Sequence, residues 1–193
     1  MIRDFYYKLE KNSLGRFFIL QIFLILLAMF NFFLNLLPFH IWKRIICLIA
    51  GIKVSNTSTI CNGVRFLSFG RCQIGERTII NRNCLLDNRY FLNIGNDVSI
   101  ASGTHIFTQG HDVDSSTFEL TNAEVNIKNN VCIFAGVMIM PGVTLSRGCV
   151  VLPGAVVTRN VDELAVVGGV PAKKIKLRNC IPEYKLGRQF WYT

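Results

Sequence analysis

The chain has 193 residues, enough for one folded domain with a core and too few for two ordinary domains joined by a linker. Hydrophobic residues make up 51% and charged residues 17%, so some apolar surface is expected to meet something other than water. The net charge is +9, and the basic residues are concentrated in the C-terminal tail. No basic surface with interleaved aromatic residues is evident there, which argues against a nucleic-acid partner.

An apolar run at residues 17–39 comes first in chain order and has about the length that a bilayer-spanning helix needs. It is too long for the core of a secretory signal and no small-residue cleavage site follows, so we expect it to be retained. The stretch HIWKRIICLIAG then reads as an interfacial helix that ends at Gly51. We therefore expect a hydrophobic helical segment over residues 1–53, with residues 17–50 associated with a membrane.

The flanking cations do not choose an orientation for this segment, because they nearly balance. They are Arg3, Lys8, Lys11 and Arg16 before it and Lys43, Arg44 and Lys53 after it. An in-plane or hairpin arrangement broken between Asn31 and Pro38 would keep both flanks at the anionic cytosolic surface. We favour that arrangement over a single crossing, and the sequence leaves both open.

A six-residue period then dominates the chain. Its aliphatic positions are Ile127, Ile133, Ile139, Leu145, Val151 and Val157, preceded in other registers by Ile74, Ile80, Leu86, Ile94, Ile100 and Ile106, and by Val54, Ile60 and Phe66. Aliphatic residues at steps of six cannot line one face of an α-helix, but they fit a unit of one short strand and one turn. Three such units make a triangular coil, whose aliphatic residues stack on those of the coils above and below. A sandwich of short strands would have looser spacing, of about 8–12 residues.

This pattern resembles the hexapeptide-repeat acyltransferase family over residues 54–178. The motifs GHDVD at 110–114 and GGVPAKKI at 168–175 resemble its sugar O-acetyltransferases, such as the maltose and galactoside enzymes and those that modify capsule, colanic acid or O-antigen. The resemblance implies an all-β fold, a left-handed parallel β-helix, assembled as a homotrimer with active sites between neighbouring prisms. Residues 179–193 are then a short C-terminal tail of unassigned role.

The rhythm stops between Ile106 and Val125, and the polar residues 107–124 are predicted to form an outward loop that carries catalytic groups. An alcohol needs a base to become a nucleophile, and histidine has an ordinary pKa near neutrality. The resemblance implies that His111 is this general base and that the hydroxyl attacks the thioester of acetyl-CoA directly in a ternary complex. The group that holds the other ring nitrogen, a carboxylate or a backbone carbonyl, is left open.

The acceptor side of the site also comes from the resemblance. Asn81 matches an acceptor-binding asparagine of the family, Asn83 lies two residues on, and Asp112 adjoins the histidine. Both asparagines could instead be turn or ladder residues. The family's acidic acceptor-binding residue is not reproduced, because Asn88 and Arg89 occupy the matching places, so a different acceptor is expected.

Coenzyme A is expected in a groove between two prisms. The resemblance places the pantetheine against backbone near Ala135 and Pro153, the adenine end near Thr158 and Arg159, and the phosphates at Lys173 and Lys176. The alternative for the lysines is a solvated basic tail.

These features predict an acetyl-CoA-dependent O-acetyltransferase acting on a sugar hydroxyl in bacterial surface polysaccharide biosynthesis, at the cytoplasmic face of the inner membrane. One alternative is an N-acetyltransferase of an amino sugar, and another is a non-catalytic β-helix that organises a membrane complex. No metal is expected, because zinc-dependent β-helices need three histidines and the coil region offers only His105 and His111. The seven cysteines form no C-x-x-C pair and fit a reduced compartment.

Overall fold

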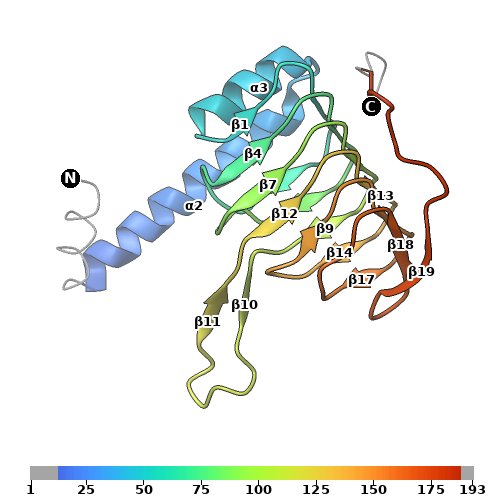
Figure 1. Cartoon of the computed structure of the whole chain (residues 1–193). Coiled ribbons are helices and arrows are strands. Elements are labelled where there is room, and N and C mark those ends of the chain that lie inside the picture. Colours follow the sequence, from blue (N-terminus) through green and yellow to red (C-terminus); the bar gives the residue numbers. More distant parts are fainter. Residues whose placement is uncertain (1–12, 188–193) are drawn as a thin grey trace.

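A computed structural model describes residues 13–187 and shows a triangular prism of stacked coils with two helices at its N-terminal end (Figure 1). The helices are α2 (Ser13–Leu36) and α3 (His40–Ile49). The prism is a solenoid of about six turns, a left-handed parallel β-helix, so the predicted fold class is confirmed. Its handedness departs from the usual right-handed crossover between parallel strands.

Three sheets form the faces of the prism, and each of the first five coils contributes one short strand to each, while the last coil adds two strands to sheet 2. Sheet 1 contains β1 (Lys53–Val54), β4 (Cys72–Ile74), β7 (Leu92–Ile94), β12 (Val125–Ile127) and β15 (Thr144–Leu145). Sheet 2 contains β2 (Thr59–Ile60), β5 (Ile79–Ile80), β8 (Ser99–Ile100), β13 (Cys132–Ile133), β16 (Val150–Val151), β18 (Ala165–Gly168) and β19 (Lys173–Leu177). Sheet 3 contains β3 (Arg65–Phe66), β6 (Leu85–Leu86), β9 (His105–Ile106), β14 (Met138–Ile139) and β17 (Val156–Val157). Within these sheets β19 alone pairs antiparallel, with β18.

The six-residue repeat forms the core, as the periodicity predicts. In sheet 1, Ile74 pairs in register with Ile94, Ile94 with Ile127, and Ile127 with Leu145, and these four side chains are buried. Every aliphatic position of the period is likewise at most 5% exposed. One column of stacked side chains therefore runs through the prism and removes its apolar area from water.

Polar side chains of α2 close the open edge of the first coil. The Asn31 amide donates to the carbonyl of Phe66 at 3.0 Å and its oxygen accepts the Phe66 N–H at 2.9 Å. Asn35 likewise accepts the N–H of Gly63 at 2.6 Å and donates to the carbonyl of Val64 at 3.1 Å. The asparagines that interrupt the apolar run thus pair with backbone that a neighbouring coil would otherwise satisfy.

From α3, the buried Lys43 donates to the carbonyl of Ile60 at 3.1 Å and to the Asn62 side chain. Arg44 donates to the carbonyl of Val54 at 3.0 Å. Two of the cations expected to flank the apolar run therefore bind protein backbone, while Arg3, Lys8 and Lys11 lie outside the described residues.

Replacing Asn31 with alanine is expected to lower the free energy of unfolding by about 1–3 kcal/mol, because it leaves the Phe66 backbone without its partners. Gln21→Ala, in the same helix but remote from the coil edge, is the control and should change stability little. Chemical denaturation in detergent micelles measures both variants. Equal stabilities of the two variants would contradict this role for Asn31.

The C-terminal tail turns back along the corner between sheets 1 and 2. The Tyr184 hydroxyl donates to the carbonyl of Asn130 at 3.0 Å, and the Leu186 N–H donates to the Asp97 carboxylate at 2.9 Å. The tail, for which the sequence suggests no role, therefore ties several coils together; residues 188–193 lie outside the described part of the chain.

Candidate active site

The chain leaves the prism after β9 and returns at β12, forming an arm in between. The arm is an antiparallel pair, β10 (Gln109–His111) and β11 (Leu120–Asn122), that projects beyond the coils (Figure 1). Its side chains include the exposed apolar residues Val113, Phe118 and Leu120. The interruption of the repeat therefore forms an outward excursion with a fixed base.

His111 lies on the arm and is oriented by Phe118. Its Nδ1 is 2.9 Å from the carbonyl oxygen of Phe118, and the two rings stack with centroids 4.2 Å apart and planes 5° from parallel. Phe118 has a φ of 51°, a left-handed conformation that is uncommon for a residue with a side chain.

A carbonyl oxygen can only accept, so Nδ1 carries the hydrogen in this bond. In the neutral ring Nε2 is then unprotonated and able to accept a proton. The orienting group that the sequence leaves open is, in this structure, a backbone carbonyl. The neighbouring Asp112 accepts the Asp114 N–H at 2.9 Å through its carboxylate and is exposed.

The base of the arm is held by the buried carboxylate of Asp87. Asp87 is 0% exposed and accepts the Thr108 N–H at 3.1 Å, three residues before His111. It also accepts the backbone N–H of Arg89 at 3.1 Å and two guanidinium bonds from Arg89, each of 2.9 Å. Thr108 in turn accepts the Tyr90 N–H through its hydroxyl at 3.0 Å.

Burial by itself would raise the pKa of the Asp87 carboxyl, but the hydrogen bonds from Arg89 and Thr108 outweigh it and lower the pKa below its ordinary value. Asp87 is therefore charged at neutral pH and clamps the corner where the arm begins. The neighbouring Asn88 is fully buried as well, and its side chain bonds to the backbone of Leu67, Ser68 and Gly70. Of the two residues at the unmatched acceptor position, Arg89 alone is exposed.

Two predicted acceptor residues lie at the corner between sheets 2 and 3. Asn81 follows β5, is partly buried and donates from its amide to the carbonyl of Ile100 at 3.1 Å. Asn83 is exposed with a φ of 58°, and its N–H donates to the carbonyl of Asn62 at 3.2 Å, as the turn-residue alternative would have it. Their roles toward an acceptor stay predictions.

The same corner carries two predicted coenzyme residues. Ala135 and Pro153 are exposed and stack in consecutive coils, with the Gly154 N–H donating to the Ala135 carbonyl at 2.9 Å. The ladder continues through Ser102, whose carbonyl accepts the Gly136 N–H at 3.0 Å. One edge of the prism thus collects Asn81, Ala135 and Pro153.

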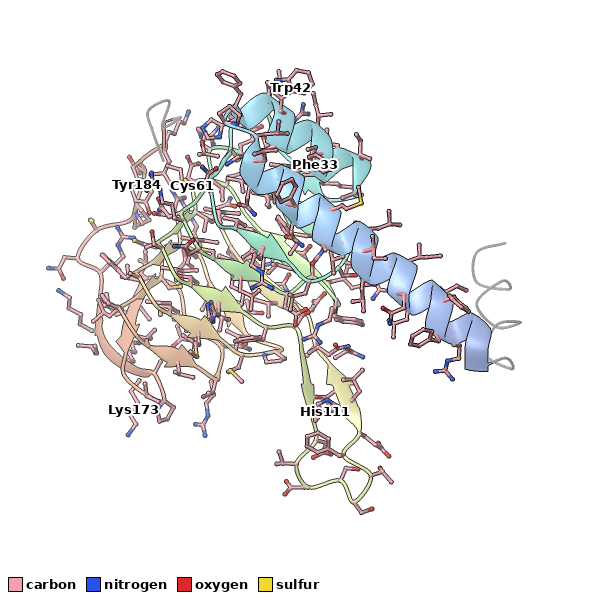
Figure 2. The ribbon with its side chains drawn as sticks, turned by 180° about the vertical axis from the view of Figure 1, so that it is seen from behind. Phe33, Trp42, Cys61, His111, Lys173 and Tyr184 are labelled. Carbon is pink, nitrogen blue, oxygen red and sulfur yellow. The ribbon has the colours of Figure 1, made fainter. Side chains whose placement is uncertain are left out.

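The other predicted coenzyme residues are not brought to that edge. Thr158 and Arg159 follow β17 and lie at the opposite end of its strand, at the corner between sheets 3 and 1. Lys173 and Lys176 are exposed on β19, the last strand of the described part. Figure 2 shows Lys173 at the last coil and His111 on the separate arm.

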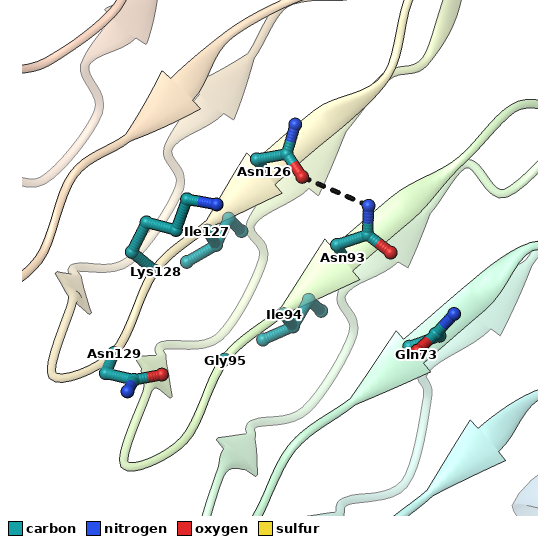
Figure 3. Close-up of a pocket in the computed structure, with 8 residues that line it drawn as sticks. All are labelled: Gln73, Asn93, Ile94, Gly95, Asn126, Ile127, Lys128 and Asn129. Carbon is teal, nitrogen blue, oxygen red and sulfur yellow. Dashed lines mark hydrogen bonds between the residues drawn. The ribbon is translucent and has the colours of Figure 1, made fainter.

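A polar hollow of about 350 Å³ lies on sheet 1 (Figure 3). The Asn93 amide donates to the Asn126 side chain at 3.0 Å across it, and Asn129 accepts the Asn96 N–H at 2.9 Å. Lys128 is the one titratable side chain of its lining. These amides make hydrogen bonds between neighbouring coils. The lining contains no histidine or carboxylate, so the hollow lacks the base that acyl transfer needs.

Sequence reasoning missed two residues of the site, Asp87 and Phe118. A signal for Asp87 existed, because the period lengthens from six to eight between Leu86 and Ile94 and the extra residues are polar. The contact of Phe118 with His111 depends on the pairing of β10 with β11, which no repeat in the sequence predicts.

Comparison with known proteins gives relatives at the level of sequence. Protein CapG of Staphylococcus aureus is 40% identical over 121 residues, 60% of this chain and 63% of that protein. Galactoside O-acetyltransferase of Escherichia coli is 31% identical over 115 residues, 58% of this chain and 57% of that enzyme. The chain thus spans less than two thirds of the length of these relatives. No protein-family model matches it.

Solved structures give the fold. A hexapeptide-repeat acetyltransferase of Vibrio cholerae, complexed with acetyl coenzyme A, superposes with a TM-score of 0.73 at 24% identity, over 78% of this chain and 84% of that chain. The stacked coils thus define a left-handed parallel β-helix. The sequence relatives include acetyltransferases, and the structural neighbours include hexapeptide-repeat acetyltransferases, so these are the proteins that the chain is similar to.

Proposed function

We propose that the protein is an acetyl-CoA-dependent O-acetyltransferase of a sugar hydroxyl. The observation that carries this proposal is His111, held by the Phe118 carbonyl so that Nε2 is left to accept a proton. The sequence relatives include galactoside O-acetyltransferase, which supports a sugar acceptor.

The reaction needs one base and no covalent enzyme intermediate. Nε2 of His111 takes the proton of the acceptor hydroxyl while its oxygen attacks the thioester carbonyl. The C–O bond forms, the C–S bond breaks, and the coenzyme A thiolate leaves and takes the proton from the imidazolium. The described cysteines are free, but their thiols are not needed as nucleophiles.

A homotrimer would complete the site. In the single chain His111 is exposed on the arm, and Val113 and Phe118 are 83% and 60% exposed. Large apolar side chains at such exposure favour a partner surface. Four of the residues predicted for coenzyme A lie on two corners of the prism, and a groove between two prisms would bring such corners together.

Lys173→Ala is expected to raise the KM for acetyl-CoA about three- to tenfold with little change in kcat, because an exposed lysine binds a phosphate as a screened point charge. The effect should shrink as salt is added. Lys128→Ala, which removes an exposed lysine that directly follows β12, is the control. An unchanged KM in the Lys173 variant would contradict a role in coenzyme A binding and favour the alternative that Lys173 belongs to a solvated basic tail.

The proposal also concerns where the protein acts in the cell. One segment of α2, Gly15–Leu36, is long and apolar enough to cross a membrane. An acetyltransferase held at the cytoplasmic face of the inner membrane would meet acetyl-CoA and membrane-linked glycans, which supports a role in surface polysaccharide biosynthesis.

Coenzyme A release with a panel of acceptors tests the function. Neutral sugars, amino sugars and lipid-linked glycans are each offered with acetyl-CoA, and the acetylated product is tested for alkali lability. An alkali-labile ester on a sugar is the expected result. A stable amide on an amino sugar would favour the N-acetyltransferase, and no turnover with any acceptor together with no coenzyme A binding would favour a non-catalytic scaffold.

A further inference from the structure

The two N-terminal helices expose an unusually apolar surface. Along the first half of α2, Phe17, Phe18 and Ile22 are each 56–57% exposed. On α3, Trp42 is 52% exposed. Figure 2 shows Trp42 and Phe33 on the helical end of the molecule, away from the arm of His111. A continuous apolar surface of this kind is unfavourable in water and indicates a site of interaction.

The second half of α2 is attached to the prism. Contact begins at Phe23, whose ring lies 5.5 Å from that of Phe69. Phe30 is 7% exposed and packs between Phe66 and Phe69, with centroid distances of 5.9 and 5.8 Å. The bonds of Asn31 and Asn35 to the edge of the first coil follow. From Phe23 onward the helix is therefore part of the folded body.

What remains free is too short to cross a bilayer. From Ser13 to Ile22 the helix extends about 15 Å, at about 1.5 Å per residue, whereas the hydrocarbon core is about 30 Å thick. The sequence before it contains Arg3, Asp4, Lys8, Glu10 and Lys11, and such charges are costly in hydrocarbon. The attached half carries the polar edge of the prism, which cannot enter hydrocarbon either.

The charge around these helices fits an anionic lipid surface. No Asp or Glu occurs between Lys11 and Gly75, whereas the same stretch carries Arg16, Lys43, Arg44, Lys53, Arg65 and Arg71. Lys53, Arg65 and Arg71 are exposed on the first two coils, next to the helices. Such cations are drawn to the headgroups of the cytoplasmic leaflet.

An apolar hollow adds to the fit. It has a volume of about 370 Å³ and lies between α2 and α3, lined among others by Phe30, Phe33 and Ile49. Irregular apolar space open on one side can be filled by acyl chains.

We propose that α2 and α3 dock the protein monotopically: the free half of α2 enters one leaflet of an anionic bilayer, and the chain emerges on the side from which it entered. This inference rests on the membrane association proposed above. It goes beyond that association because it excludes a single crossing by α2.

The topology is tested with the full chain carrying a protease-cleavable epitope at each end, expressed in bacteria. In inverted inner-membrane vesicles, protease should remove both epitopes, and in intact spheroplasts it should remove neither. Epitopes on opposite faces would overturn monotopic docking while leaving membrane association intact. Recovery of the protein as a soluble oligomer, without lipid or detergent, would overturn both, and would assign the apolar surface to contacts between copies.

A matched pair of variants tests the lipid contact. Ile22→Asp should weaken flotation of the purified protein with phosphatidylglycerol-containing vesicles by roughly tenfold or more, because it puts a charge in the leaflet. Ile181→Asp, at a similarly exposed isoleucine of the tail, should float as wild type. Equal flotation of the two variants would overturn the docking surface. Coenzyme A release measured in detergent reports separately on acetyl transfer, so failure of the one proposal is distinguishable from failure of the other.

Discussion

Replacing His111 with alanine is expected to lower kcat for acetyl transfer about 10²- to 10⁴-fold while the affinity for coenzyme A stays near that of the wild type. The reason is that a hydroxyl is a poor nucleophile until a base takes its proton, and a positioned general base contributes about that much. Steady-state release of coenzyme A and calorimetric binding of coenzyme A measure the two quantities.

Two variants bracket this result. His105→Ala removes a half-buried imidazole from β9, whose ring contacts Phe107 where the arm begins and not the paired strands that carry His111, and should leave kcat within a few-fold. Phe118→Leu keeps the carbonyl that holds Nδ1 of His111 but removes the stacked ring. Its decrease in kcat should therefore lie between those of His105→Ala and His111→Ala. If turnover of His111→Ala matched that of His105→Ala, the base would have to be another group.

Replacing Asp87 with alanine is expected to lower the free energy of unfolding by about 1–3 kcal/mol and kcat by about 10- to 100-fold. The Thr108 N–H would be left buried without a partner, and the arm that carries His111 would lose its anchor. A displacement of about 1 Å at a catalytic group can cost a factor of about 100. Asp87→Asn, which keeps one acceptor oxygen for Thr108, should recover part of kcat.

Asp97 provides the matched control for stability. It is a carboxylate that is 6% exposed, receives two guanidinium bonds from Arg77 at 2.8 Å, and lies away from the arm. Asp97→Ala should therefore destabilise the fold to a similar extent with kcat nearly unchanged. Equal losses of kcat in the two variants would show that Asp87 acts through general stability and not through the arm.

Both carboxylates also predict how stability depends on pH. The Arg77 guanidinium lowers the pKa of Asp97, and bonding outweighs burial to lower that of Asp87. A carboxyl whose pKa is lower in the folded state binds more protons when unfolded, so its stabilisation is complete above the ordinary pKa of about 3.9 and declines as pH falls through the folded value. Acid denaturation of Asp87→Asn should therefore be less steep below about pH 4 than that of the wild type.

The period of the sequence determined the core, because an aliphatic residue every six positions can be buried only if each coil stacks in register on the next. It also located the arm, since the run from Phe107 to Glu124 lacks the aliphatic residue at every sixth position that stacking requires. His111 was predicted within it because the motif GHDVD resembles that of the sugar O-acetyltransferases. These are properties of local pattern, and local pattern is what a sequence displays directly.

Tertiary structure alone decided which groups meet. The Phe118 carbonyl faces Nδ1 of His111 because β10 and β11 pair in one register, and Asp87 reaches Thr108 because two coils stack at a lengthened corner. Asn31 and Asn35 read as interruptions of an apolar run, yet they pair with the edge of the first coil. In each case the partner lies far away in sequence or at a turn without a repeat, so the contact exists only once the chain has folded.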